Sequence, residues 1–209
     1  MELLKDRRVM LMVAVFSGAM ATACVFPSLD VTSWSLTTGL GTPPTEDPRL
    51  AHIAGLLKES RTGLNDTIEL RLAEVILEES LKHDVDPLLV MALIRTESTF
   101  DNWAQSHKGA LGLMQIMPET GRWVAGEFDI EWGGEGTLFD PYQNVRLGIR
   151  YYSVLRERYG NDTRLTLTAY NEGPTRLSRR IRRGRKPPRR YASKVLAHYR
   201  DFKESAVYN

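Results

Sequence analysis

The sequence predicts a mainly α-helical single domain with a small loop or β region, preceded by an N-terminal export or anchor segment and a flexible linker. Three observations support this prediction. Apolar residues recur with helical spacing beyond residue 66, an uncharged apolar run lies near the N-terminus, and a segment rich in Ser, Thr, Gly and Pro separates the two. We therefore divide the 209 residues into an export or anchor segment (1–26), a mostly flexible linker (27–65) and a folded domain (66–205).

The composition narrows the class of protein. Hydrophobic residues make up 42% of the chain and charged residues 26%, which excludes a wholly disordered protein. The single cysteine, Cys24, rules out an intrachain disulfide framework, and the four histidines are too scattered to form a paired-ligand motif. We therefore expect neither a metal nor a cofactor.

Residues 1–26 are typical of an export signal. Three basic residues precede the apolar run Val9–Phe16, and small residues crowd before Cys24. The run Ala-Thr-Ala-Cys resembles a bacterial lipoprotein processing site, which makes Cys24 a lipidation candidate. Ordinary cleavage after Ala23 and an uncleaved membrane anchor remain open, and all three readings place the domain outside the cytoplasm.

The first two helices of the domain are predicted from caps and spacing. Asp66 or Thr67 is expected to cap a helix with one apolar face, formed by Leu70, Ala73, Ile76, Leu77 and Leu81. Asp86 and Pro87 begin the next helix, because a capping carboxylate followed by proline is favoured at a helix start.

Three more helices are expected towards the C-terminus. Asn144 opens the first and Gly160 ends it; the others cover residues 163–171 and 189–204. Residues 104–141 are rich in glycine and show no long period, so we expect loops and a small β element there.

An arginine-rich segment, residues 176–190, carries nine basic side chains and no acidic one. The whole chain has a net charge of only +2, so the remainder is net acidic. The segment is interpreted either as a solvated surface loop or as a contact with an anionic wall polymer or membrane surface. An exported protein makes nucleic acid an improbable partner, and we predict none.

Glu97 is the candidate catalytic residue. Stepping along the helix from Val90 and Ile94 places Glu97 on the buried face, near the helix C-terminus. Apolar surroundings and the negative end of the helix dipole both raise the pKa of a carboxyl group. Such an acid stays protonated near neutral pH and can donate its proton to a leaving oxygen.

The segments around and after Glu97 resemble the soluble lytic transglycosylases, a family in the goose-type lysozyme clan. The resemblance covers roughly residues 70–203, and rests on Glu97-Ser98, Gly112-Leu113-Met114-Gln115-Ile116-Met117-Pro118, Ala169-Tyr170-Asn171 and a final tyrosine, Tyr191. Two departures are visible: Glu172 replaces the family's alanine after Asn171, and Pro187-Pro188 replace a Glu-Thr pair before Tyr191.

The resemblance implies a lysozyme-like fold and a peptidoglycan lytic transglycosylase. Glu97 would be the sole acid and base in cleavage of the MurNAc–GlcNAc β-1,4 bond, leaving 1,6-anhydromuramoyl ends. It also implies a set of substrate-binding residues: Ser106, Met114, Gln115, Tyr170, Asn171 and Tyr191. The hydroxyl of Tyr170 is expected to bond Glu97.

Two alternatives remain open at this point: a lysozyme-type hydrolase of the same fold, and a non-catalytic wall-binding scaffold. The implied partners are peptidoglycan glycan strands and a membrane reached through the N-terminal segment. The expected location is the periplasm or cell envelope, in cell-wall remodelling or turnover.

Overall fold

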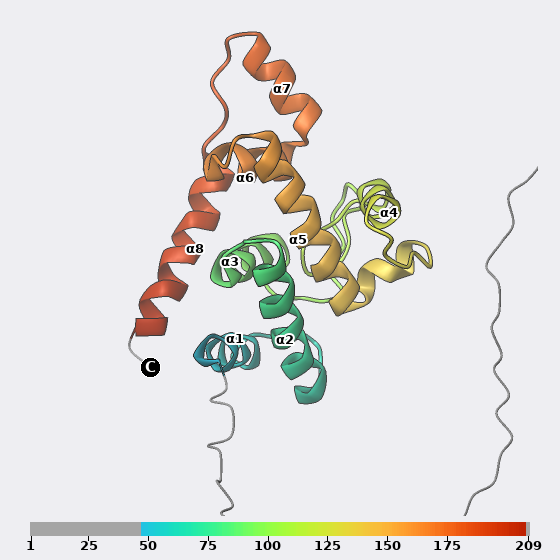
Figure 1. Ribbon diagram of the computed structural model, residues 1–209, viewed down its shortest axis with the longest axis vertical. Helices are drawn as coiled ribbons and strands as arrows, with labels where there is room; N and C mark the ends of the chain where they lie inside the picture. Colours follow the sequence, from blue (N-terminus) through green and yellow to red (C-terminus); the bar gives the residue numbers. More distant parts are fainter. Residues whose placement is uncertain (1–46, 208–209) are drawn as a thin grey trace, which may run out of the picture. The chain divides into compact units, whose positions relative to one another are not determined.

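The computed structural model describes residues 47–207, and these residues form a mainly helical domain (Figure 1). The expectations for residues 1–26, Cys24 included, and for the linker up to residue 46 lie outside the described residues. The elements, in chain order, are α1 (Pro48–Lys58), α2 (Asp66–Lys82), α3 (Pro87–Glu97), α4 (Pro118–Glu127), the 3₁₀ helix η1 (Glu135–Phe139), α5 (Pro141–Arg158), α6 (Thr163–Glu172), α7 (Pro174–Arg182) and α8 (Arg190–Val207). The predicted mainly α fold is confirmed.

Local sequence explains where most of these helices begin. Five of them start at a proline, which lacks the N–H that a first helical turn leaves unpaired. Aspartate side chains then accept hydrogen bonds from backbone N–H groups in the first turns of four helices, from positions Asp47, Asp86, Asp140 and Asp162. The start of α3 at Asp86 and Pro87 is thus as predicted.

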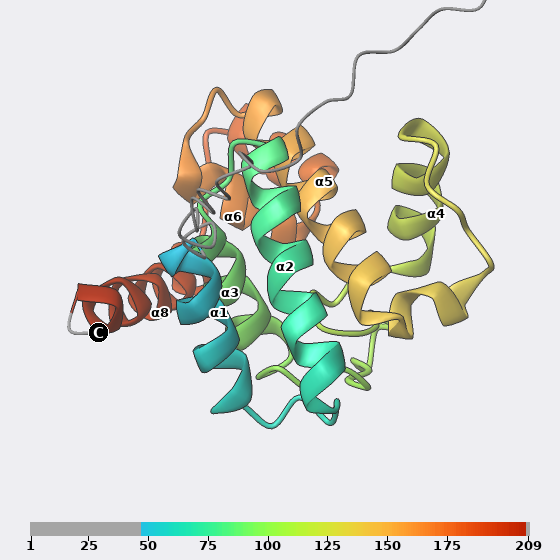
Figure 2. The same ribbon diagram turned by 60° about the horizontal axis from the view of Figure 1, so that its bottom comes forward.

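Helix α3 lies at the centre of the domain. Six consecutive residues of it, Leu89–Ile94, are buried, and the helix packs against α2 and α8. Helices α1, α2 and α3 lie side by side (Figure 2). Because α1, α2 and α8 pack around α3, the core fixes the position of Glu97, the last residue of α3.

Several local predictions are corrected by the structure. Asn65, rather than Asp66 or Thr67, caps α2, and its side chain accepts a hydrogen bond from the N–H of Ile68. Leu70 and Leu81 are each 51% exposed, so the buried face of α2 is rotated away from these two residues. Ala73, Ile76 and Leu77 are buried as predicted, and Leu72 and Val75 are buried with them.

The region 104–141 is more helical than predicted. It contains α4 and η1, and its β structure consists of two isolated bridges, which join Gln105 to Leu111 and Leu111 to Ile116. Glycines within α4 obscured its period, because Gly121 is buried against Trp132 while Gly126 faces open space. Helix α5 begins at Pro141, and Asn144 is a buried residue of its first turn.

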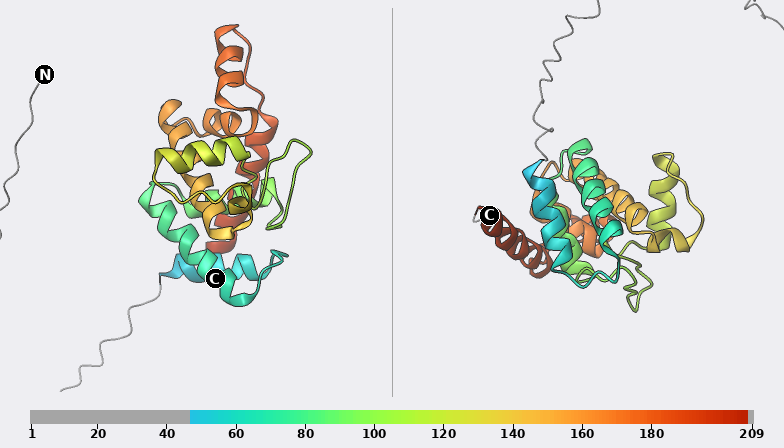
Figure 3. Two further views of the ribbon diagram at one scale, coloured as in Figure 1. Left: turned by 90° about the vertical axis from the view of Figure 1, so that its right-hand side faces the viewer. Right: turned by 90° about the horizontal axis from the view of Figure 1, so that it is seen from below.

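Two further corrections concern the ends of the domain. Helix α1 occupies part of the expected linker and buries Ile53 and Leu57 against the domain core. Helix α7 covers the first half of the arginine-rich segment, which was expected to lie between helices. Helix α7 and the loop after it project beyond α6 and the start of α8 (Figures 1 and 3). Within residues 47–207, no helix combines the length and hydrophobicity that a membrane crossing requires.

Candidate active site

Glu97 is the last residue of α3 and lines a pocket of about 420 Å³. The pocket lies between the end of α3, the end of α6 and the start of α8, and its polar lining includes Glu97, Asn171, Glu172, Arg190, Tyr191 and Lys194. Burial raises the pKa of Glu97, while the hydrogen bond from Tyr191 and the charge of Lys194 lower it by smaller amounts. The net effect favours the protonated acid, as the sequence predicted.

Tyr191 is the side chain in direct contact with this acid. Its hydroxyl donates a hydrogen bond to Oε1 of Glu97 from the first turn of α8. Burial, and then the nearby Glu97 carboxyl, raise the pKa of Tyr191 well above its ordinary value, so the hydroxyl keeps its proton. Because Oε1 is occupied by this bond, Oε2 is the oxygen left to carry and transfer a proton.

Tyr170 is placed differently from the expectation. Its hydroxyl donates to the backbone oxygen of Met114, at 2.9 Å, and not to Glu97. The side chain is nevertheless close enough for the Glu97 charge to be a cause, after burial, of its raised pKa. Tyr170 thus connects α6 to the loop of residues 111–116 through a hydrogen bond.

That loop is held by buried polar contacts. Oδ1 of Asn144 accepts from the N–H of Met114 at 2.8 Å, and its Nδ2 donates to the backbone oxygens of Leu111 and Leu138 at 3.0 and 2.8 Å. Gly112 has φ +73°, and an added Cβ would lie 2.2 Å from the oxygen of Leu138. The glycine is therefore required by both conformation and space.

The predicted contacts of Met114 and Gln115 with substrate are not evident in this geometry. The Met114 side chain is completely buried and packs against Gly148, so it has no surface to offer a ligand. Gln115 has φ +49°, and its Nε2 donates to the backbone oxygens of Ala104 and Gly112 at 3.0 and 3.1 Å. These amide hydrogens stabilise the loop, which leaves only the carbonyl oxygen for the predicted glycan contact.

The remaining predicted residues lie on either side of the loop. Ser106 is half-buried, and its Oγ accepts from the N–H of Ala110 at 3.0 Å, which closes a turn between them. Asn171 is exposed and lines the Glu97 pocket. The structure thus gathers Glu97, Tyr191 and Asn171 at one pocket, while Gln115 lies in the loop of residues 111–116 and Ser106 in the turn before it.

Two charged residues of the pocket, Arg190 and Lys194, were missed from the sequence; they lie on α8 beside Tyr191. The sequence signal for Lys194 was its spacing, because it is three residues after Tyr191 and so lies on the same helix face. Glu172, noted from the sequence only as a departure from the family motif, also lines the pocket and is ion-paired with Arg180 at 3.6 Å.

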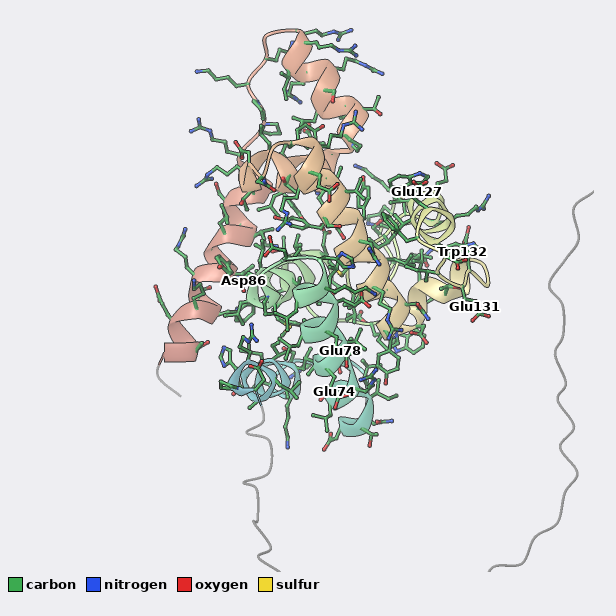
Figure 4. All side chains as sticks on the ribbon, viewed as in Figure 1. Glu74, Glu78, Asp86, Glu127, Glu131 and Trp132 are labelled. Atoms are coloured by element: carbon green, nitrogen blue, oxygen red, sulfur yellow. The ribbon has the colours of Figure 1, made fainter. Side chains whose placement is uncertain are left out.

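A larger cavity, of about 700 Å³, lies at the opposite end of α3. It includes Asp86, which is labelled in Figure 4. That carboxylate already accepts a hydrogen bond from the N–H of Leu88, at 2.9 Å, and another from the hydroxyl of Tyr199. Since Asp86 serves as a helix cap, the site at Glu97 is the better candidate for acid–base chemistry.

Comparison with known proteins decides the family. Residues 74–192 match the model of the transglycosylase SLT domain. The chain belongs to this family. The matched region contains Glu97, the loop at 111–116, Asn171 and Tyr191.

The relatives of this chain include soluble and membrane-bound murein transglycosylases. The chain is 32% identical over 128 residues to the soluble lytic murein transglycosylase of Salmonella typhimurium, and the match covers 61% of this chain and 19% of that protein. It is 35% identical over 108 residues to the membrane-bound lytic murein transglycosylase C of Cronobacter sakazakii, covering 47% of this chain and 30% of that protein. The chain thus spans less than a third of the length of either relative.

Solved structures agree with the assignment. The 70 kDa soluble lytic transglycosylase of Escherichia coli superposes with a TM-score of 0.58 at 28% identity, over 66% of this chain and 26% of that one. Lytic transglycosylase Slt of Pseudomonas aeruginosa gives the same TM-score at 26% identity, over 63% and 24% of the two chains. That second structure is an inactive variant in which one glutamate is replaced by glutamine.

Tyr191→Phe is expected to shift the pH dependence of activity. Its hydrogen bond lowers the pKa of Glu97, so its removal lets burial raise that pKa further. For a reaction that starts from the protonated form of Glu97, the limb of the kcat/KM profile that descends with rising pH should move to higher pH. A profile in which that limb stays in place, or moves to lower pH, would contradict the role given to this contact.

Proposed function

We propose that this protein is a peptidoglycan lytic transglycosylase that cleaves the β-1,4 bond between MurNAc and GlcNAc. The observation that carries the proposal is Glu97, a carboxyl group with a raised pKa in a pocket, held on one oxygen by Tyr191. The murein transglycosylase relatives supply the substrate class. The inactive glutamate variant of the Pseudomonas aeruginosa enzyme is consistent with dependence on a single acid.

In the proposed mechanism Glu97 acts twice. Its Oε2 proton passes to the glycosidic oxygen as the bond from C1 of MurNAc to that oxygen breaks. The 2-acetamido oxygen of the same sugar stabilises the cation that forms at C1. Glu97, now a carboxylate, takes the proton of the C6 hydroxyl while the C6 oxygen bonds to C1, and this step restores the acid.

Tyr191 and Asn171 have supporting roles in this mechanism. The Tyr191 hydroxyl stabilises the carboxylate between the two proton transfers, because a charge-assisted hydrogen bond is stronger than a neutral one. Asn171 is exposed at the pocket, and we propose that its side-chain amide hydrogen-bonds the sugar. Ser106 and Gln115, in and just before the loop of residues 111–116, are proposed to bind the glycan strand.

The mass of the released fragments tests this function. Purified sacculi are digested with the full chain, and the soluble muropeptides are analysed by mass spectrometry. Anhydro products lighter by about 18 Da than hydrolysed ones are expected, because the C6 hydroxyl replaces water as the nucleophile. Products with reducing ends, or no products at all, would contradict the proposal.

A hydrolase is the second candidate, and Glu172 is the observation that favours it. This carboxylate lines the same pocket as Glu97, and most glycosidases use a pair of catalytic carboxyl groups. Arg180 binds one of its oxygens, while the other is buried without a hydrogen-bond partner in the described residues. If Glu172 activates water, the products carry reducing ends and Glu172→Gln slows the reaction severely. If the lytic route holds, that variant still yields anhydro products.

We place the protein at the cell envelope, where its proposed substrate lies. The relatives include both soluble and membrane-bound murein transglycosylases. Attachment to a membrane would depend on residues 1–26, through a lipid on Cys24 or an uncleaved anchor. Recovery of the protein in the cytoplasmic fraction of its own cells would contradict this location.

A further inference from the structure

Two cationic side chains stand beside the catalytic acid without an evident structural task. Arg190 and Lys194, here called the basic wall, are exposed and lie four residues apart on α8. Both line the pocket that contains Glu97. Within residues 47–207 neither forms an ion pair with a carboxylate, whereas Arg180 at the same pocket is paired with Glu172.

The placement of the basic wall has costs for the isolated protein. Like charges four residues apart on a helix repel each other, which disfavours α8 slightly. The charge of Lys194 also lowers the pKa of Glu97, against the need for a protonated acid. An anion bound at the wall would remove both disadvantages, so these costs favour a role in ligand binding.

The surroundings extend the positive charge of the wall. Helix α7 and the loop before α8 contribute the other basic residues of the segment 176–190, and most of them are exposed. In Figure 4 long, nitrogen-tipped side chains fan out from this projection. A surface of one sign beside a pocket attracts an oppositely charged ligand and orients it during approach.

We propose that the basic wall binds carboxylates of the peptide stems, so that the enzyme prefers peptide-bearing glycan strands to peptide-free ones. This inference rests on the proposed function, because it assumes that MurNAc occupies the pocket. In a strand with stems the sugar backbone is uncharged, because the lactyl carboxyl group of each MurNAc forms the amide bond to its stem, whereas the stems carry free carboxylates. Each stem is attached to MurNAc, the residue whose C1 reacts at Glu97, so its charges enter the neighbourhood of the wall whenever the substrate binds.

Binding to inactive protein tests the inference independently of catalysis. Fluorescent, uncross-linked glycan strands are prepared with their stems and, after amidase treatment, without them. The lactyl carboxyl group that the amidase frees on each MurNAc is converted to its methylamide, so that the peptide-free strands stay uncharged. Their Kd values are measured for Glu97→Gln protein and for the same protein carrying Arg190→Gln and Lys194→Gln. The matched control carries Arg200→Gln and Lys203→Gln, two exposed cations further along α8.

Loss of the wall is expected to weaken binding of peptide-bearing strands roughly tenfold, or about 1.4 kcal/mol, since two exposed charge pairs are removed. Peptide-free strands should be affected much less, and the control should leave both Kd values unchanged. The preference for peptide-bearing strands should also shrink as salt is raised from about 0.05 to 0.5 M, because screening weakens exposed pairs.

Several outcomes would overturn the inference. Equal Kd values for the two kinds of strand, or an equal loss of affinity for both in the wall variant, would show that the basic wall does not bind the stems. Unchanged strand binding with lost affinity for vesicles of anionic phospholipid would assign the wall to a membrane. Failure of the active protein to cleave either strand would count against the proposed function, while the binding result would still decide the role of the wall.

Discussion

Replacing Glu97 with Gln is expected to abolish the release of soluble muropeptides while the protein stays folded. An amide has no proton to give to the glycosidic oxygen, and it cannot take one from the C6 hydroxyl. General acid–base catalysis contributes about 10²- to 10⁴-fold, and here one residue performs both transfers, so a rate reduction at the upper end of this range is expected. The measurement is the initial rate of product release from purified sacculi.

Stability separates a catalytic role of Glu97 from a structural one. Its pKa is raised in the folded protein, so the folded state binds the proton more tightly than the unfolded state does. Stability is therefore lost as pH rises from the unfolded pKa through the folded pKa, and a neutral glutamine avoids this loss. The variant should unfold at the same temperature as the unmodified protein in acid and at an equal or higher temperature near neutral pH.

Glu119→Gln is the matched control for this experiment. Glu119 is an exposed carboxylate in the first turn of α4, shortly after the loop of residues 111–116. Its replacement should change the rate less than twofold, which is ordinary for a surface position away from the reacting atoms. Substantial cleavage by Glu97→Gln, or an equal loss in the two variants, would remove Glu97 from its assigned role.

Asn144→Ala is expected to have the largest effect on stability. The truncation leaves two buried backbone groups, the N–H of Met114 and the oxygen of Leu138, without a partner, whereas the Leu111 oxygen still accepts from the N–H of Ile116 at 3.0 Å. Each unpaired group costs about 1–3 kcal/mol, so a loss of about 2–5 kcal/mol in the free energy of unfolding is expected after some relaxation. Chemical denaturation measures this directly.

Gln143→Ala provides the comparison on the same helix. The Gln143 side chain makes none of the hydrogen bonds that hold the loop of residues 111–116, and a change of about 1 kcal/mol or less is expected. Activity should fall with Asn144→Ala as well, because the loop carries the backbone oxygen that Tyr170 binds. Similar unfolding energies for the two variants would show that Asn144 does not hold the loop.

The sequence was most informative where local signals and packing agree. The start of α3 followed from Asp86 and Pro87, and its apolar spacing placed Glu97 on the buried face. The same signals were overlooked at α1, where Asp47 and Pro48 mark the helix start and Ile53 and Leu57 lie four residues apart on the buried face. The reasoning failed at Leu70 and Leu81, since helical spacing shows which residues share a face but not how much of that face is covered.

Contacts between distant segments were harder to predict. The motif residues indicated a common site, yet which tyrosine bonds Glu97 depends on how α6 and α8 pack, 73 and 94 residues further along the chain. The pairing of Tyr170 with the Met114 oxygen likewise depends on the path of the loop, which Asn144 and Gly112 set from within the core. Such distances are properties of the tertiary structure and have no local sequence signal.

We propose that one carboxyl group, Glu97, cleaves the glycan without water. Digestion of sacculi in H₂¹⁸O tests it most directly, because hydrolysis must add a solvent oxygen at C1 and the intramolecular route must not. Newly formed anhydro ends that carry no ¹⁸O are expected. Newly formed reducing ends heavier by about 2 Da would show that water is the nucleophile and would contradict the single-acid mechanism.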